Sequence, residues 1–235
     1  MKLSNVFINA LKLVQATFAT HFLGALILFV VVFTVYALLL TTLWGMPIEG
    51  IVELSKDPER LTTYVNQPNF VIKFWFFSLL VDGIITPFTA GVYRNYAEVI
   101  RGERPTLRNL FAYYRARETN HILGHVILQM CLKTLVSVGA IAIGTAALGL
   151  ALTTIISLVF VLTVPIIVLE GKSLFRAMGH SYQRIMRAPF TALIITAFGV
   201  VCLLIGLFAF GIGVTVTYSY LLAGIFSIYQ ATSNK

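Results

Sequence analysis

The chain has 235 residues, of which 58% are hydrophobic and only 11% are charged, and its mean hydropathy is +0.90. Soluble domains carry roughly a quarter charged residues, so this composition excludes an ordinary soluble domain and indicates a membrane protein. The net charge is +8, but the basic residues lie in short connectors between apolar runs. Nucleic-acid binding needs an exposed basic face that follows the phosphates, so we expect no nucleic-acid partner.

Residues 1–20 predict an amphipathic segment that leads directly into a membrane span. One helical face carries apolar side chains at Leu3, Val6, Phe7, Ala10, Leu11 and Val14. The apolar run that follows, Phe22–Leu43, is longer than the roughly 7–15 residues of a signal-peptide core, and no small-x-small cleavage site follows it. We therefore expect a retained first span from about His21 to Leu43.

The segment from about Trp44 to Asn69 is the only sizeable connector expected on the far side of the membrane. It mixes acidic and basic residues and contains Pro47, Pro58 and Pro68. Because proline interrupts helices, we predict irregular structure or one short helix there. A second span follows from about Phe70 to Asn95.

A basic connector, Gly91–His121, follows the second span and turns at Gly102 and Pro105. Apolar side chains at i, i+3, i+4 and i+7 then share one helical face, namely Leu107, Leu110, Phe111 and Tyr114. Four arginines decorate the remainder: Arg104, Arg108, Arg115 and Arg117. A basic helix with such a stripe is typical of a helix lying in the plane of a membrane surface.

The segment from Ile122 to Leu169 is too long for one crossing and predicts two spans joined by a turn near Gly149. Small residues recur through Gly139–Ala151, which favours close packing of helices. The final apolar run, Pro189–Tyr229, is again of double length, and Gly211 and Gly213 mark its expected turn.

Between these two runs, Glu170–Arg187 predicts a third amphipathic connector. Its expected apolar face is formed by Leu174, Met178, Tyr182 and Ile185, and its basic residues are Lys172, Arg176, Arg184 and Arg187. The prediction is thus an all-α helical bundle of about six spans in one integral domain, residues 1–235. The basic connectors and both termini fall on one side, which the positive-inside rule makes cytoplasmic.

Short sequence similarities indicate an internal repeat. LSNVF at residues 3–7 resembles LRNLF at 107–111, and HFLGALIL at 21–28 resembles HILGHVIL at 121–128. A third copy, from Ser173 to Ile195, keeps the pattern without the residues. We predict three parallel repeats of an amphipathic helix and a two-span hairpin, at about 1–98, 99–170 and 171–235. The alternative is that any span entered from the cytoplasm after a surface helix shows this pattern.

Two segments carry a resemblance to a bacterial family. VPIIVLEGKSLFRAMGHSYQRIMRAPF (Val164–Phe190) combines a proline in a span, an acidic-Gly exit and an amphipathic A-x-x-x-S-[WY] helix. GVYRNYAEVIRGERPTLRNLFAYYR (Gly91–Arg115) resembles an RGE-x-P-[ST]-x-x-D-L-F connector, with Asn109 at the usual acidic position. Both are similar to YciC-like proteins and to the membrane domain of some glycerophosphodiester phosphodiesterases. The resemblance implies a six-span bacterial inner-membrane protein and no catalytic residue.

Asp82 and Lys133 are the charged residues expected nearest the middle of the membrane. An unpaired charge there is costly, so such residues usually face the bundle interior and pair. The pair would be either a stabilising ion pair or a site for a coupling ion or substrate, and lysine can also snorkel to the surface. Pro87 and Pro165 each lie in the second span of a hairpin, where we expect helix kinks rather than the broken helices of transporters.

The four histidines are expected near the cytoplasmic surface. His121 and His125, at i and i+4, share a helix face and form a weak candidate site for a metal or haem. A metal site usually needs a third ligand, so we expect none, and no cofactor. No nucleophile–base pair or phosphate-binding glycine loop is present in the sequence.

The sequence therefore predicts a non-enzymatic scaffold, accessory subunit or envelope-maintenance factor of the membrane. The expected partners are membrane lipids, with other subunits or a second copy as further possibilities. Anionic head groups would be bound by Arg104, Arg108, Arg115, Arg117, Arg176, Arg184 and Arg187. The alternative is a small transporter or lipid carrier that uses Asp82 and Lys133.

Overall fold

The computed structural model describes residues 3–208 and 212–233, and every regular element in these ranges is an α-helix. Within these ranges, five segments are long and apolar enough to cross a membrane: Leu3–Trp44, Pro68–Ile100, Thr119–Ala142, Ala146–Glu170 and Pro189–Gly206. The predicted all-α fold class and its compatibility with a membrane are therefore confirmed.

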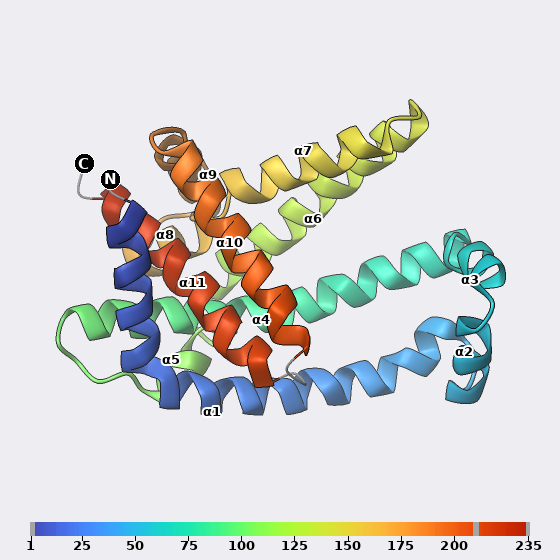
Figure 1. Ribbon diagram of the computed structural model, residues 1–235, viewed down its shortest axis with the longest axis horizontal. Coiled ribbons are helices and arrows are strands. Elements are labelled where there is room, and N and C mark those ends of the chain that lie inside the picture. The colour runs from blue at the N-terminus through green and yellow to red at the C-terminus, as the bar shows by residue number, and fades with distance from the viewer. Residues whose placement is uncertain (1–2, 209–211, 234–235) are drawn as a thin grey trace. The chain divides into compact units, whose positions relative to one another are not determined.

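The chain divides into two compact units. The large unit consists of Met1–Leu26 and Thr86–Lys235, and the small unit of Ile27–Ile85. Two long helices, α1 (Leu3–Trp44) and α4 (Pro68–Ile100), contribute to both units (Figure 1).

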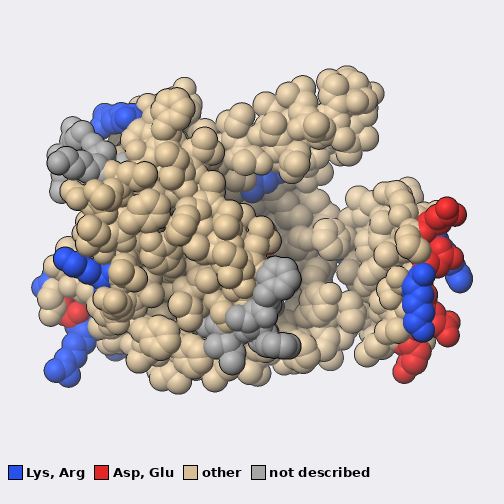
Figure 2. All heavy atoms as spheres, viewed as in Figure 1, with Lys and Arg blue, Asp and Glu red and all other residues tan. Residues whose placement is uncertain are grey.

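The small unit contains two short helices where irregular structure or a single one was expected, α2 (Ile48–Ser55) and α3 (Pro58–Val65). The prolines do not interrupt these helices, because they stand at or just before helix starts, where no amide N–H is needed. Asp57 caps α3 by accepting a hydrogen bond from the Arg60 amide at 3.0 Å. On the face drawn in Figure 2, the charged side chains of this unit gather around α2 and α3.

The remaining helices belong to the large unit. They are α5 (Leu107–Ala112), α6 (Thr119–Ala142), α7 (Ala146–Val159), α8 (Thr163–Glu170), α9 (Leu174–Met186), α10 (Pro189–Phe208) and α11 (Ile212–Ser233). The largest fully buried side chains include Tyr96, Leu110, Ile122, Leu162, Ile166, Ile185, Phe226 and Ile228. The core of this unit therefore draws on α4, α5, α6, α8, α9 and α11.

The amphipathic segment at the N-terminus is continuous with the first span, because α1 runs without interruption from Leu3 to Trp44. It contains no glycine or proline before Gly24, so nothing in the sequence ends the helix. The predicted apolar face is buried at Val6, Ala10 and Val14, whereas Leu11 is half exposed.

The turn after α6 lies at Gly144 rather than near Gly149, so that prediction was wrong. Gly144 has φ of 72°, a left-handed conformation that glycine adopts at little cost. Gly149 instead lies inside α7 and is buried, and a Cβ there would come within 2.8 Å of the Ala140 Cβ. Small residues thus let α6 and α7 approach closely, as the Gly139–Ala151 pattern predicts.

The last two helices also pack through glycine. A Cβ on Gly224 of α11 would lie 2.7 Å from Ile195 Cγ2 of α10. Of the two glycines expected at their turn, Gly213 is part of α11 and Gly211 lies outside the described residues. The amphipathic N-terminal segment contacts this hairpin. Phe7 packs edge-to-face on Phe198, with 5.2 Å between the two ring centroids.

Candidate functional site

The connector between α4 and α5 is held against α4 by a close backbone approach. A Cβ on Gly91 would lie 2.5 Å from both Cα and O of Leu110, so only glycine fits at this position. Leu110 is completely buried. The basic connector therefore packs closely onto α4.

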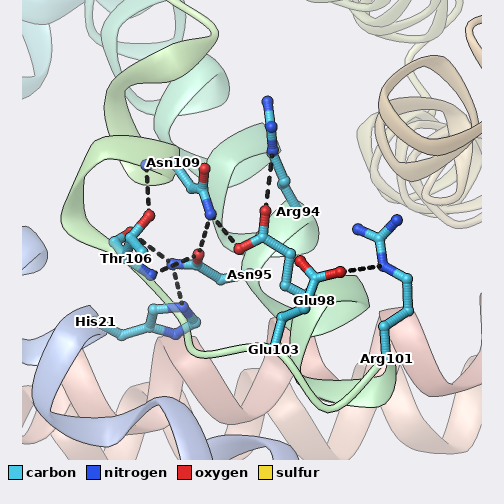
Figure 3. Close-up of polar contacts among 8 residues, drawn as sticks. All are labelled: His21, Arg94, Asn95, Glu98, Arg101, Glu103, Thr106 and Asn109. Atoms are coloured by element: carbon cyan, nitrogen blue, oxygen red, sulfur yellow. Dashed lines mark hydrogen bonds and ion pairs between the residues drawn. The ribbon is translucent and has the colours of Figure 1, made fainter.

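Asn95 lies at the centre of this junction and is completely buried. Its side chain donates to the Thr106 carbonyl and accepts from the Thr106 amide, both at 3.1 Å, and accepts from Asn109 Nδ2 at 2.9 Å (Figure 3). His21 of α1 lies against the same amide, with Nε2 3.5 Å from Asn95 Nδ2. One side chain thus joins α4, the connector and α5.

Asn109 extends the network toward charged groups. Its Nδ2 also donates to Glu98, which is buried, and Glu98 pairs with Arg94 at 3.4 Å (Figure 3). An amide can donate two hydrogen bonds, one to Asn95 and one to the Glu98 carboxylate, whereas an ionised carboxylate can only accept. Asparagine at position 109 therefore suits the local hydrogen bonding, whereas a carboxylate would not.

We expect Asn109→Asp to lower stability at neutral pH by about 1–2 kcal/mol, because it places a carboxylate against Glu98. The like charge raises the pKa of the new carboxyl in the folded protein, and stability is lost as the pH rises through that pKa. The loss is therefore smaller near about pH 4 than at neutral pH. Thermal unfolding in detergent across this range measures the effect.

Asn120→Asp is the matched control, since Asn120 is exposed in the first turn of α6. A stability loss in Asn109→Asp that does not change with pH would contradict this account.

Two tyrosines after α5 are shielded from water. Burial raises the pKa of Tyr113, although the neighbouring Arg94 opposes the shift. Burial also raises the pKa of Tyr114 to about 12. Both phenols therefore remain neutral at physiological pH, and the positive charge of the connector is not offset there.

A second junction joins α8 and α9 at a break within the candidate span Ala146–Glu170. The helix stops at Val159 and resumes at Thr163, two residues before Pro165. The Ser181 hydroxyl of α9 enters this break, donating to the Val159 carbonyl at 2.7 Å and accepting from the Leu162 amide at 3.2 Å. Ser181 is completely buried, so it satisfies backbone groups that no water reaches.

The predicted kinks at the two prolines differ in form. Pro165 is the third residue of α8, so it lies in the first turn after the break. Proline has no amide N–H and its ring crowds the preceding turn, which accounts for the interruption of the helix there. Pro87 is buried within α4, which continues through it.

An ion-pair cluster fixes the other end of the same junction. Gly171 ends α8 in the left-handed conformation, with φ of 62°. Glu170 just before it pairs with Lys172 at 2.9 Å and with Arg184 of α9 at 2.6 Å. The Arg184 guanidinium also lies over the Tyr229 ring, 5.2 Å from its centroid.

Six of the seven arginines expected to bind lipid are exposed: Arg104, Arg108, Arg115, Arg117, Arg176 and Arg187. Arg184 differs, because its side chain is only 12% exposed and its guanidinium forms an ion pair with Glu170. It is therefore a structural residue of the α8–α9 junction.

The exposed surface of α9, together with Phe190, combines basic and large apolar side chains. Phe175 is 76% exposed and Phe190 78% exposed, and Arg176 and Arg187 are exposed beside them. Tyr182, expected on the packed face, is also exposed, and Ala177 and Ser181 occupy that face instead. Small residues bring α9 closer to α8 than tyrosine would permit.

Asp82 and Lys133 lie in different units. Asp82 is an exposed residue of α4 in the small unit, and Lys133 is a half-buried residue of α6 in the large unit. The expected ion pair between them stays a prediction.

The predicted histidine pair lies at the start of α6, with His121 exposed and His125 buried. Within residues 3–208 and 212–233, no group of three or more His, Cys, Asp or Glu side chains gathers in a way that could hold a metal ion. These histidines therefore have no third ligand among the described residues.

Comparison with known proteins gives no assignment for the chain. No family model, no curated protein and no solved structure matches it. The resemblance to YciC-like proteins therefore stays a prediction carried by the two segments that surround the α4–α5 and α8–α9 junctions.

Proposed function

We propose that this chain is a non-enzymatic bacterial inner-membrane protein, a scaffold or accessory subunit that binds anionic lipid head groups on its cytoplasmic side. The observation that carries the proposal is the outer surface of α9 and Phe190. Aromatic side chains reach the interface between head groups and acyl chains, and adjacent arginines attract anionic lipids.

The apolar surface of both units supports a location within lipid. Leu38 of the small unit is 70% exposed, and Leu135, Ile143 and Leu150 of the large unit are 72%, 69% and 72% exposed. Soluble monomers rarely expose extended apolar patches of this kind, whereas acyl chains solvate them without cost.

The buried polar groups support a scaffold rather than an enzyme. Asn95, Asn109 and Glu98 are engaged in holding the connector to α4, and Ser181 is engaged in bridging the break before α8. In both junctions the polar chemistry serves to fix surface segments to membrane-spanning helices.

The proposal includes six spans in three repeats, with α11 as the sixth span. Three contacts between the expected repeats support it. A Cβ on Gly24 of α1 would overlap the Leu110 side chain of α5, and one on Gly124 of α6 would lie 3.2 Å from Leu174 of α9. Phe198 of α10 contacts Phe7 of α1. Each expected amphipathic segment thus packs against the first span of another repeat.

The double substitution Arg176→Gln/Arg187→Gln tests lipid binding at α9. Each near-surface charge contributes about 1 kcal/mol of attraction, so we expect a several-fold loss of preference for anionic lipid. Electron paramagnetic resonance of the full chain in vesicles measures this preference, using spin-labelled phosphatidylglycerol and phosphatidylcholine with identical acyl chains.

Arg176→Lys/Arg187→Lys is the control, because it keeps both charges at the same positions and should retain the preference. High salt should weaken the preference of the unmodified chain, since ions screen exposed charges. Equal lipid selectivity in the glutamine variant and the unmodified chain would overturn the proposal.

A further inference from the structure

A pocket of about 270 Å³ lies within the large unit, between the C-terminal ends of α4, α8 and α11. Its lining includes Ala97, Ile100 and Arg101 from the end of α4, Leu169 from α8, and Tyr229 and Gln230 from α11. Arg101 is the only charged side chain among the described residues that line it. Sequence patterns gave no indication of this pocket, because its walls come from three separate segments.

The free charge in the pocket is that of Arg101. Its side chain is 61% exposed. Among the described residues only its Nε approaches a partner, lying 3.8 Å from the carboxylate of Glu103, whose side chain is 57% exposed (Figure 3). Exposed ion pairs of this length are weak, so the two terminal nitrogens remain able to bind an anion. Guanidinium groups bind phosphate through paired hydrogen bonds.

The other walls of the pocket are largely apolar, and an apolar wall beside the charged Arg101 points to an amphiphilic ligand. Leu169 gives an apolar wall, and Ile100 beside Arg101 is 49% exposed. Gln230 adds an amide that can hydrogen-bond a head group or an ester. A pocket of this volume is at the lower end of small-molecule sites, so it accommodates a head group while acyl chains extend outside over Ile100.

The pocket also lies at the depth where phospholipid head groups occur. Arg101 directly follows the candidate span Pro68–Ile100, and Leu169 is the penultimate residue of the candidate span Ala146–Glu170. Basic pockets between membrane-spanning helices are typical binding sites for anionic lipid head groups.

We propose that this pocket binds the phosphate-bearing head group of one anionic phospholipid, with Arg101 holding the phosphate. The inference rests on the membrane location in the proposed function, but not on lipid binding by the surface of α9. It predicts a single site with defined stoichiometry, unlike the distributed attraction of exposed arginines.

The test titrates the full chain in detergent with phosphatidylglycerol and counts bound lipids by native mass spectrometry. We expect Arg101→Gln to weaken binding of the first phosphatidylglycerol by about five- to tenfold, and to leave phosphatidylcholine with the same acyl chains unaffected. Ala97→Leu fills the pocket without changing charge and should weaken the same binding event. Arg60→Gln, which alters an exposed arginine of α3 outside the lining, is the matched control.

Unfolding temperatures of the variants separate loss of binding from loss of folding. Equal first-lipid affinities in Arg101→Gln, Ala97→Leu and the unmodified chain would overturn the site. Displacement of the lipid by millimolar inorganic phosphate would assign the pocket to a free anion instead and would also overturn it. Loss of selectivity in Arg176→Gln/Arg187→Gln leaves this site intact, so the two proposals fail separately.

Discussion

Replacing Asn95 with alanine is expected to lower the free energy of unfolding of the chain by about 3 kcal/mol. The substitution removes the partner of the Thr106 amide, the Thr106 carbonyl and the Asn109 side chain at a completely buried position. Burial without a hydrogen bond costs each of these groups part of its desolvation energy, and the missing side-chain volume adds a cavity.

Reversible unfolding in mixed micelles measures this loss. Asn120→Ala serves as the control, because Asn120 is exposed and should change stability by less than about 0.5 kcal/mol. Equal stabilities of the two variants would show that the Asn95 hydrogen bonds do not hold the connector. A specific consequence is that trypsin cleavage after Arg108 should accelerate in Asn95→Ala only, since the connector is released.

Ser181→Ala is expected to be the next most destabilising change, by about 2 kcal/mol. It leaves the Val159 carbonyl and the Leu162 amide without the hydroxyl that bridges them. The cost is high for a serine because water does not reach this break, where Leu162 and Ser181 are both completely buried.

Unfolding of Ser181→Ala is compared with that of Ser173→Ala, in which the altered serine is exposed and makes no capping hydrogen bond. A double-mutant cycle with Pro165→Ala sharpens the result. If proline causes the break, its removal lets the helix satisfy its own backbone, and the cost of losing Ser181 shrinks. Additive effects of the two substitutions would refute this coupling.

Much of the fold follows from the spacing of apolar residues along the chain. Runs long enough to cross a membrane predict the helical segments, and three residues of the N-terminal apolar face, Val6, Ala10 and Val14, are buried. The positions of the turns could not be predicted in the same way, because several glycines lie close together in the sequence. Gly144 and Gly149 both lie in a small-residue stretch, and periodicity does not distinguish a glycine at a turn from one at a helix contact.

The junctions that organise the large unit were largely missed. Asn95 and Ser181 are single polar residues within or beside apolar patterns, and nothing local indicates that their partners lie in another segment. Arg184 carries the same charge as Arg176 and Arg187, yet only the fold brings Glu170 to it. The available signal was the A-x-x-x-S-[WY] segment that follows a proline in an apolar run, and this pattern does not show which backbone groups the serine reaches.

The contact between Phe7 and Phe198 has a consequence for biosynthesis. Phe7 leaves the ribosome about 190 residues before its partner Phe198 in α10, and Tyr96 must likewise wait for the Ser219 carbonyl of α11. At about 5–20 residues per second, the N-terminal face stays uncovered for on the order of ten seconds or more. During that interval the contacts made by α10 and α11 are missing, so packing of the large unit is completed only after both helices have been synthesised.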